Sequence, residues 1–380
     1  MSAGRAPVAR RAPGKLFVAG EYAVVEPGTP ALLVAVDRHL TATVSEPTGD
    51  GVLISSDLLP TPTRWHWRED RLEPAPGEHT ERARRELAHA TAAVRVVARW
   101  LADNGLPAPE FDLAIRSALH QGGVKLGLGS SGAVTVATIS AAAAYYGLDP
   151  TIEQRYRLAL LAAAELDPTG SGADLAAGTW GGWISYRAPD RTAILDLARR
   201  RGLAAALQDP WPGFAVRRLP PPQGLALEVG WTGTPASTAS LLARLRRRAW
   251  SGTASHRRFL ETTTDCVQAC VEALERGDPT ALLDQIRRTR GELARLDEEF
   301  GIGIFTPALT ALCDIAEAAG GAAKPSGAGG GDCGIALLES EGTGHRRDRA
   351  PRAIDQLRQR WTTAGVRPLA LSPARNEDEE

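Results

Sequence analysis

Three lysines are the residues of this chain best suited to handling phosphate. Only 3 of the 44 lysines and arginines are lysine. Each lies in a glycine-rich or turn-rich stretch: Lys15 ends the turn 12–15, Lys125 precedes a glycine-rich run, and Lys324 opens another. Because arginine serves as the general surface cation here, a retained lysine indicates a site that needs a compact ammonium group. An ammonium beside flexible backbone predicts polyphosphate binding.

The run after Lys125 predicts a phosphate-binding loop at the start of a helix. A helix N-terminus offers free amide groups and the positive end of a dipole. The pattern G-x-G-x-x-G also occurs in dinucleotide-binding and protein-kinase loops, but the strand and partner motifs of those classes are missing. A purely structural glycine turn is the alternative. The residues of the run are Gly127, Leu128, Gly129, Ser130, Ser131 and Gly132.

Two further segments have unusual turn chemistry. Thr169–Asp174 is a tight turn that ends in a carboxylate, which is typical of either an Asx-type turn or an active site. Lys324–Asp332 contains four glycines among the five residues 327–331. A simple turn does not need so many glycines, so this segment predicts backbone packed closely against a ligand.

Strand and helix patterns are mixed along the whole chain and predict an α+β fold. The proline run at 219–222 is the best linker, so we expect domains at 1–222 and 223–372 and a disordered acidic tail at 373–380. The expected strands are 16–19, 31–36, 40–44, 52–55, 111–115, 180–186, 226–229, 334–338 and 366–371. The expected helices are 81–103, 131–146, 151–165, 236–249, 255–276, 279–299, 306–319 and 351–364.

Composition limits the class of partner. The formal net charge is −1, so there is no basic field to attract nucleic acid or anionic lipid. The four cysteines have neither paired nor zinc-site spacing, so we expect free thiols in a reducing cytoplasm. The longest uncharged stretch, 127–146, is too short to span a bilayer, and the first residues do not form a secretory signal. We therefore expect a small-molecule enzyme with no nucleic-acid or membrane partner and predict no oligomeric state.

Taken together, the three glycine-rich segments resemble the signature motifs of the GHMP small-molecule kinases, which include galactokinase, homoserine kinase and mevalonate kinase. The similarity runs from about residue 12 to residue 372. Lys125–Gly132, Gly230–Thr238 and Lys324–Gly334 most resemble the bacterial phosphomevalonate kinases of this family. The resemblance implies an N-terminal βαβ domain like that of a ribosomal protein, a ferredoxin-like C-terminal domain, and a site between them.

The resemblance also implies roles for individual residues. The loop 127–132 would bind the phosphates of ATP, and Ser131 would bind Mg²⁺ with Glu165 as the nearest candidate for a carboxylate ligand. Lys15, Lys125 and Asp174 would be catalytic. The implied substrate-binding residues are Lys15, Ser171, Ser237, Thr238, Lys324, Ser326, Gly327, Gly329, Gly330 and Asp332.

The implied reaction transfers the ATP γ-phosphoryl group to (R)-5-phosphomevalonate, giving 5-diphosphomevalonate and ADP in the mevalonate route to isoprenoids. A phosphate monoester has a second pKa of about 6, so it is already a nucleophilic anion at neutral pH and needs no strong base. We therefore expect Lys15 and Lys125 to neutralise charge, and Asp174 to orient Lys15 or the substrate. The alternatives are a kinase with a hydroxyl acceptor, such as mevalonate kinase, a diphosphomevalonate decarboxylase, and a catalytically silent sensor.

Overall fold

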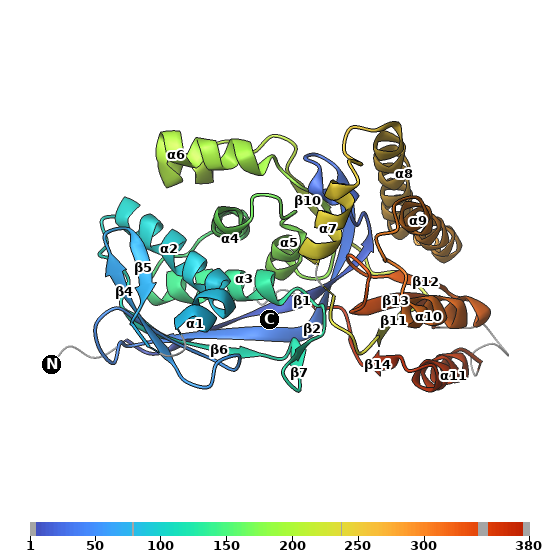
Figure 1. Ribbon diagram of the computed structural model, residues 1–380, viewed down its shortest axis with the longest axis horizontal. Coiled ribbons are helices and arrows are strands. Elements are labelled where there is room, and N and C mark those ends of the chain that lie inside the picture. Colours follow the sequence, from blue (N-terminus) through green and yellow to red (C-terminus); the bar gives the residue numbers. More distant parts are fainter. Residues whose placement is uncertain (1–4, 78–79, 237, 341–348, 375–380) are drawn as a thin grey trace.

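The computed structural model describes residues 5–77, 80–236, 238–340 and 349–374. Strands form two main sheets, and helices cover one face of the larger sheet (Figure 1). Strands and helices are mixed in both halves of the chain, which confirms the α+β class.

The larger sheet runs through the N-terminal half of the chain. Its order is β10-β9-β2-β6-β3-β4-β5, with β1 paired to β2, and its neighbours are antiparallel except for the parallel pair of β3 and β6. β1 and β2 are long and mostly buried, so they form the floor on which the helices pack. The strands are β1 (Val8–Ala19), β2 (Pro30–Ser45), β3 (Val52–Ser56), β4 (Thr63–Arg68), β5 (Arg71–Pro74), β6 (Phe111–Ser117), β9 (Trp183–Arg187) and β10 (Ala215–Leu219).

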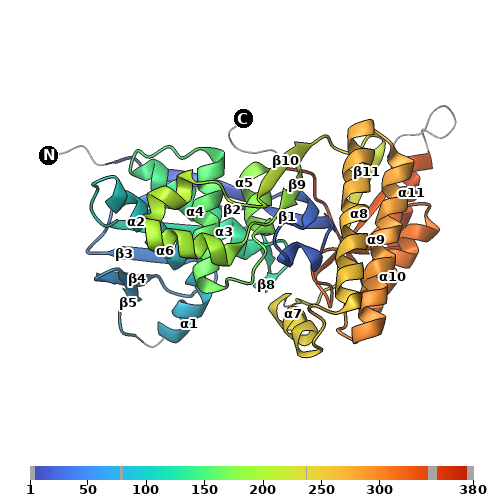
Figure 2. The same cartoon turned by 90° about the horizontal axis from the view of Figure 1, so that it is seen from above.

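Six helices belong to this half of the described chain. α3 and α5 contact β1 and β2 directly, α4 packs on α2 and α3, and α6 packs on α4 (Figure 2). α3 is rich in alanine, and small side chains let it lie close to the sheet and to three neighbouring helices. The helices are α1 (Thr80–Glu86), α2 (Ala88–Asp103), α3 (Ser130–Tyr145), α4 (Ile152–Leu166), α5 (Ala173–Trp180) and α6 (Arg191–Gln208).

The smaller sheet belongs to the C-terminal half. Its order is β12-β13-β11-β14, and every pair is antiparallel. Helix α7 (Thr238–Arg247) lies beside the junction of the two halves (Figure 1). The strands are β11 (Leu225–Trp231), β12 (Ala322–Pro325), β13 (Cys333–Glu339) and β14 (Arg367–Leu369). The remaining helices are α8 (Ala254–Arg276), α9 (Pro279–Phe300), α10 (Pro307–Ala318) and α11 (Arg349–Thr363).

Several expected elements differ from those observed. The single helix expected at 81–103 is two helices, because buried Leu87 has non-helical backbone angles between α1 and α2. The two strands expected at 31–36 and 40–44 form one strand, β2. The segment 46–77 contains β4 and β5 besides the expected strand, and its two tryptophans are structural: Trp65 is buried, and Trp67 Nε1 donates to Pro109 O (2.9 Å).

The structure shows where the chain passes from one sheet to the other and where its last described residues pack. β10 belongs to the larger sheet and β11 to the smaller one, so the chain passes between them at 220–224, and the boundary at 222 stays a prediction. Pro373 forms a β-bridge with Val36, and the Ala374 N–H donates to Ala35 O (2.9 Å). These two residues of the expected tail therefore pack on the larger sheet, and 375–380 lie outside the described residues. None of the described helices is long and apolar enough to cross a bilayer.

Candidate active site

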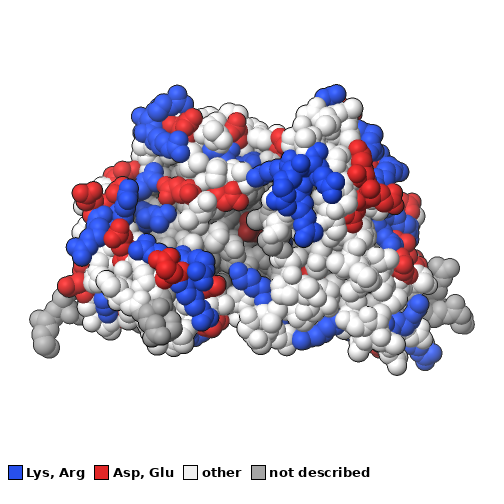
Figure 3. Space-filling view, in the orientation of Figure 1, with Lys and Arg blue, Asp and Glu red and all other residues white. Residues whose placement is uncertain are grey.

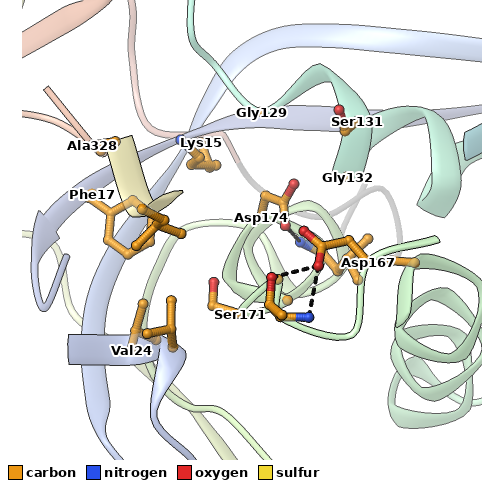
Figure 4. A pocket seen from close by; sticks show the side chains of 18 of the residues that line it. Lys15, Phe17, Val24, Gly129, Ser131, Gly132, Asp167, Ser171, Asp174 and Ala328 are labelled. Carbon is orange, nitrogen blue, oxygen red and sulfur yellow. Dashed lines mark hydrogen bonds between the residues drawn. The ribbon is translucent and has the colours of Figure 1, made fainter. Parts of the chain in front are cut away.

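A cavity of about 630 Å³ lies between the two halves of the molecule. Its walls come from β1, the segments that lead into α3 and α5, helix α7 and the glycine-rich segment after β12 (Figure 4). The cavity therefore brings together residues from all three predicted motifs. The predicted residues that line it are Lys15, Lys125, Gly127, Gly129, Ser130, Ser131, Gly132, Ser171, Asp174, Gly327 and Asp332.

Two helices begin at the wall of this cavity. α3 follows Gly129 (φ 79°) and α5 follows Gly172 (φ 73°), and both glycines adopt the left-handed conformation that other residues rarely accept. Neither glycine has a side chain that could cap its helix. At the start of α5, the Ala173 N–H instead donates to Ser171 Oγ (3.3 Å) and the Leu175 N–H donates to Asp174 Oδ1 (3.0 Å). The N-terminus of α3, with no acidic residue in its first turn, suits the binding of a polyanion.

The loop before α3 and the first turn of that helix are packed directly against acidic side chains. A Cβ atom on Gly132 would lie 2.7 Å from Asp174 Cγ, and one on Gly127 would lie 2.4 Å from Asp332 Cγ. Real Cβ atoms do not approach other atoms so closely, so only glycine allows this contact. Glycine is thus needed here to bring the loop against Asp174 and Asp332.

The two predicted catalytic lysines come from different strands. Lys15 lies on β1, where its Nζ donates to Gly127 O (3.4 Å) and its backbone N–H donates to Leu128 O (2.8 Å). Lys125 lies on the short strand β8 (Val124–Lys125), which pairs with β7 (His120–Gln121). Its side chain is exposed at the edge of the cavity. Lys15 thus touches the loop, and Lys125 leads into it.

A buried pair of tyrosines holds the turn before α5. The Tyr156 and Tyr186 hydroxyls are 2.7 Å apart, and Tyr186 donates to Ser171 O (2.6 Å). Burial raises the pKa of both phenols, so both stay protonated and can donate hydrogen bonds. Asp174 follows this turn, and its Oδ1 accepts the Leu175 N–H (3.0 Å). Figure 4 shows Lys15, Ser131 and Asp174 around the same space.

The oxygen donors around the cavity suit Mg²⁺. This ion prefers oxygen ligands and is usually bound by one or two carboxylates together with substrate phosphates and water. Ser131 and Asp174, in the first turns of α3 and α5, supply a hydroxyl and a carboxylate to one cavity.

The structure does not place Glu165 with these donors. Its carboxylate pairs with Arg99 and lies 3.7 Å from Arg95, both on α2. Glu165 does not line the cavity, although its neighbours Ala164 and Leu166 do. Neighbouring residues on a helix point their side chains in different directions. The place of Glu165 in the motif therefore did not show that its side chain faces α2 instead of the cavity.

Lys324 and Ser326 lie outside the cavity and join the two halves of the chain. Lys324 is fully buried, forms an ion pair with Glu21 and donates to Pro325 O (2.7 Å). Ser326 Oγ accepts the Phe17 N–H (2.9 Å) and donates to Phe17 O (3.1 Å). These contacts satisfy the polar atoms of both side chains inside the protein, so the structure supports a positioning role for them.

Most of the crowded glycines after Lys324 face the protein's own backbone. A Cβ on Gly329 would lie 2.5 Å from Ile304 O, and one on Gly331 would lie 2.4 Å from Thr234 O. The expectation of a ligand against these glycines is therefore corrected, because loops of the C-terminal half occupy that space. Gly329 and Gly330 do not line the cavity. Gly327 does line the cavity, and a Cβ atom placed on it would lie 3.9 Å from Lys15 Nζ.

Three predicted site residues remain: Leu128, Ser237 and Thr238. Leu128 is buried beneath the loop and does not line the cavity. Ser237 lies outside the described residues, and Thr238 begins α7.

Residues that sequence reasoning missed also line the cavity. Burial lowers the pKa of His89, which keeps the imidazole neutral at neutral pH. Asp167 Oδ1 accepts hydrogen bonds from Thr169 N (2.9 Å) and Oγ1 (2.5 Å). The turn that contains Asp167 could have been noticed, whereas His89 and Arg246 lie in ordinary helical patterns.

Replacing Lys324 with methionine is expected to lower the free energy of unfolding by about 3–5 kcal/mol. The change leaves the Glu21 carboxylate buried without its cation. Urea unfolding followed by circular dichroism measures the loss. Arg276→Met, which breaks the exposed ion pair with Glu272 on α8, is the matched control and should cost less than about 1 kcal/mol. A loss that small for Lys324→Met would contradict the stabilising role of the buried pair.

Comparison with known proteins agrees with this architecture. Residues 88–182 match the family model of the GHMP kinases N terminal domain, and residues 270–363 match that of the GHMP kinases C terminal domain. Phosphomevalonate kinase from Streptomyces sp. (strain CL190) is 60% identical over 378 residues, which cover 98% of this chain and 99% of the relative. Mevalonate kinase from Pyrococcus horikoshii is 26% identical over 86% of this chain and 87% of its own length.

A solved structure supports the same relationship. Streptococcus pneumoniae phosphomevalonate kinase, in complex with phosphomevalonate and AMPPNP, superposes with a TM-score of 0.82 and 27% identity. The match covers 97% of this chain and all of the pneumococcal one. Sequence similarity over nearly the full length and the shared two-domain fold lead to one assignment. The chain belongs to the phosphomevalonate kinases of the GHMP kinase family.

Proposed function

We propose that this protein transfers the γ-phosphoryl group of ATP to the phosphate of (R)-5-phosphomevalonate, giving (R)-5-diphosphomevalonate and ADP. The observation that carries the reaction class is the convergence of Lys15, Lys125 and the first turns of α3 and α5 in one cavity. The near-full-length identity to a phosphomevalonate kinase supports the acceptor.

The main barrier in this reaction is the approach of two polyanions. Free amides at the start of α3 are placed to receive phosphate oxygens of ATP, and the start of α5 is placed toward the acceptor. Lys15 and Lys125 add two positive charges next to the same loop. Such charges, held in place before the reaction, stabilise the phosphoryl group as it moves between oxygens.

We propose that Ser131 and Asp174 bind Mg²⁺ in the working enzyme. When bound, the ion would neutralise charge on the phosphates of ATP. The chain's own part is to present a hydroxyl and a carboxylate from two helix N-termini and to keep the cavity walls fixed around them.

The acceptor phosphate needs no proton removed by the protein at neutral pH, since its second pKa is about 6. Asp174 can therefore serve in orientation. The Cβ position of Gly129 lies within 3.3 Å of both Lys15 Cγ and Asp174 Cβ, so the two side chains approach the loop at the same point. We propose that Asp174 holds the Lys15 ammonium group and the metal ion in fixed positions relative to each other.

The acceptor is tested by measuring ADP release with 5-phosphomevalonate and mevalonate side by side. We expect kcat/KM for 5-phosphomevalonate to exceed that for mevalonate by about 10³-fold or more, because a site built for a phosphate leaves charged groups unpaired when the phosphate is missing. Mass spectrometry of the product should show a diphosphate. Equal or faster turnover of mevalonate would instead support a kinase with a hydroxyl acceptor.

We also propose a cytoplasmic location. All four cysteines are free and buried, and Cys266 and Cys270 lie one turn apart on α8. Burial raises the pKa of each thiol, so each stays protonated and serves as a small core residue. Unpaired thiols support a reducing compartment.

A further inference from the structure

Arg246 on α7 occupies the junction of two hollows. It lines the main cavity, and it also lines an adjoining recess of about 280 Å³. Leu242, Val25 and Thr169 are likewise shared by the two, so the recess opens beside the cavity wall that α7 forms. Arg246 therefore stands at the end of the cavity that continues into the recess.

The fixed cations of the cavity are divided between two places. Among the described residues that line it, Lys15 and Lys125 lie at the phosphate loop, while Arg246 comes from the C-terminal half of the chain. Figure 3 shows a cluster of basic side chains over α7, beside the hollow between the two halves. The last turn of α7 carries Arg244, Arg246 and Arg247.

Several acidic residues that line the cavity and the recess contact other groups of the protein. In the cavity, Glu21 pairs with Lys324, and Asp167 accepts hydrogen bonds from Thr169. In the recess, Asp190 accepts the Ala193 N–H (3.1 Å) at the start of α6, and Glu26 lies 3.6 Å from His256. The Arg246 guanidinium is exposed, and it forms no ion pair with another of the described residues.

Arg246 is not needed to hold α7 in place. Buried Leu241 and Leu245 pack the helix, and Arg244 fixes it by donating to Ile302 O (3.2 Å). An exposed arginine that contributes little to packing but faces a binding cavity is suited to binding a ligand.

We propose that Arg246 binds the carboxylate of the acceptor and thereby selects a substrate that is anionic at both ends. This inference rests on the proposed function, because 5-phosphomevalonate carries its carboxylate at the opposite end of a five-carbon chain from its phosphate. With the phosphate at Lys15 and Lys125, the carboxylate points away from the loop. Apolar Val24 and Leu160 line the cavity and suit the carbon chain between the two anions. The planar guanidinium can form two parallel hydrogen bonds to a carboxylate.

The variant Arg246→Gln is expected to raise KM for 5-phosphomevalonate about 10- to 100-fold, as the loss of a charged hydrogen-bond partner does. KM for ATP should stay within about twofold, because the loop before α3 is unchanged. Arg247→Gln is the matched control: it removes a neighbouring exposed charge that does not line the cavity, and its KM values should stay at the wild-type level. The KM of Arg246→Lys for 5-phosphomevalonate should lie between the values of Arg246→Gln and Arg247→Gln.

A carboxamide analogue of 5-phosphomevalonate separates direct contact from a general effect of charge. The wild-type enzyme should use the amide less well than the acid by about the same factor that Arg246→Gln costs, and the variant should no longer distinguish the two. A variant that still prefers the acid by the wild-type factor would overturn the proposal. So would an unchanged KM for the acid.

The same measurements separate this inference from the proposed function. If the wild-type enzyme does not phosphorylate 5-phosphomevalonate, the proposed function fails, and the inference fails with it. If it does, and Arg246→Gln behaves as wild type, only the role of Arg246 is lost.

Discussion

Replacing Lys125 with methionine is expected to lower kcat by about 100-fold or more, because one charge held in place for the transition state is lost. The side chain lies at the cavity edge, directly before the loop that leads into α3. We expect its ammonium to contact phosphate oxygens of both substrates. Since Lys125 is exposed, the melting temperature should stay within about 2 °C of wild type.

Steady-state and single-turnover kinetics with saturating ATP and 5-phosphomevalonate measure this effect. Lys125→Arg keeps the charge but replaces a compact ammonium with a planar group, so it should recover only part of the rate. Arg116→Met on β6, an exposed cation away from the cavity, is the control and should leave kcat unchanged. A near-normal kcat in Lys125→Met would remove this residue from the mechanism.

The second large effect is expected for Asp174→Asn, which should also lower kcat/KM by about 100-fold or more. The carboxylate packs against Gly132, and a Cβ atom on Gly129 would lie close to both Asp174 Cβ and the Lys15 side chain. An amide of the same shape keeps the packing but removes the negative charge that, in our proposal, holds Lys15 and Mg²⁺. Asp196→Asn on α6, which affects an exposed pair with Arg199, should leave the rate unchanged.

The pH dependence of Asp174→Asn distinguishes orientation from proton removal. The acceptor loses its own proton with a pKa of about 6, so a higher pH supplies the nucleophilic dianion to wild type and variant alike. We therefore expect parallel profiles of log(kcat/KM) between about pH 5.5 and about pH 8.5. If raising the pH restored the rate of the variant alone, Asp174 would be a general base.

A double variant tests the same idea in a different way. If Asp174 acts by holding Lys15, then Lys15→Met and Asp174→Asn together should cost much less than the product of their separate effects. Fully multiplicative effects would show that the two residues act independently.

The sequence predicted the lysines, glycines and Asp174 that line the cavity because their signals were local. Glycines with a left-handed backbone, lysines beside them and a charge-free helix are all visible as short patterns, and the structure brings Lys15, Ser131 and Asp174 into one cavity. The capping box of Thr151 and Gln154 likewise marks the start of α4 where the sequence predicted it.

What the sequence did not reveal depends on contacts between distant segments. Lys324 has the same motif context as Lys15, but only the folded chain shows that Glu21 meets it 303 positions away. The close approach of Gly329 to Ile304 and the ion pair between Glu165 and Arg99 on α2 also join segments that are distant in the sequence. α6 escaped notice because Gly202 (φ 85°) interrupts its helical pattern.

The buried bonds between the two halves of the chain affect how it reaches its working form. The main hydrophobic core contains Leu16 from β1 together with Val267 from α8 and Ile335 from β13, so it crosses the predicted linker. A fragment that stopped at the linker would leave the Glu21 carboxylate without its ammonium partner and would expose the part of that core that the C-terminal half covers. These buried contacts couple the two halves of the chain, so we expect enzymatic competence only after the polypeptide has been synthesised through β13.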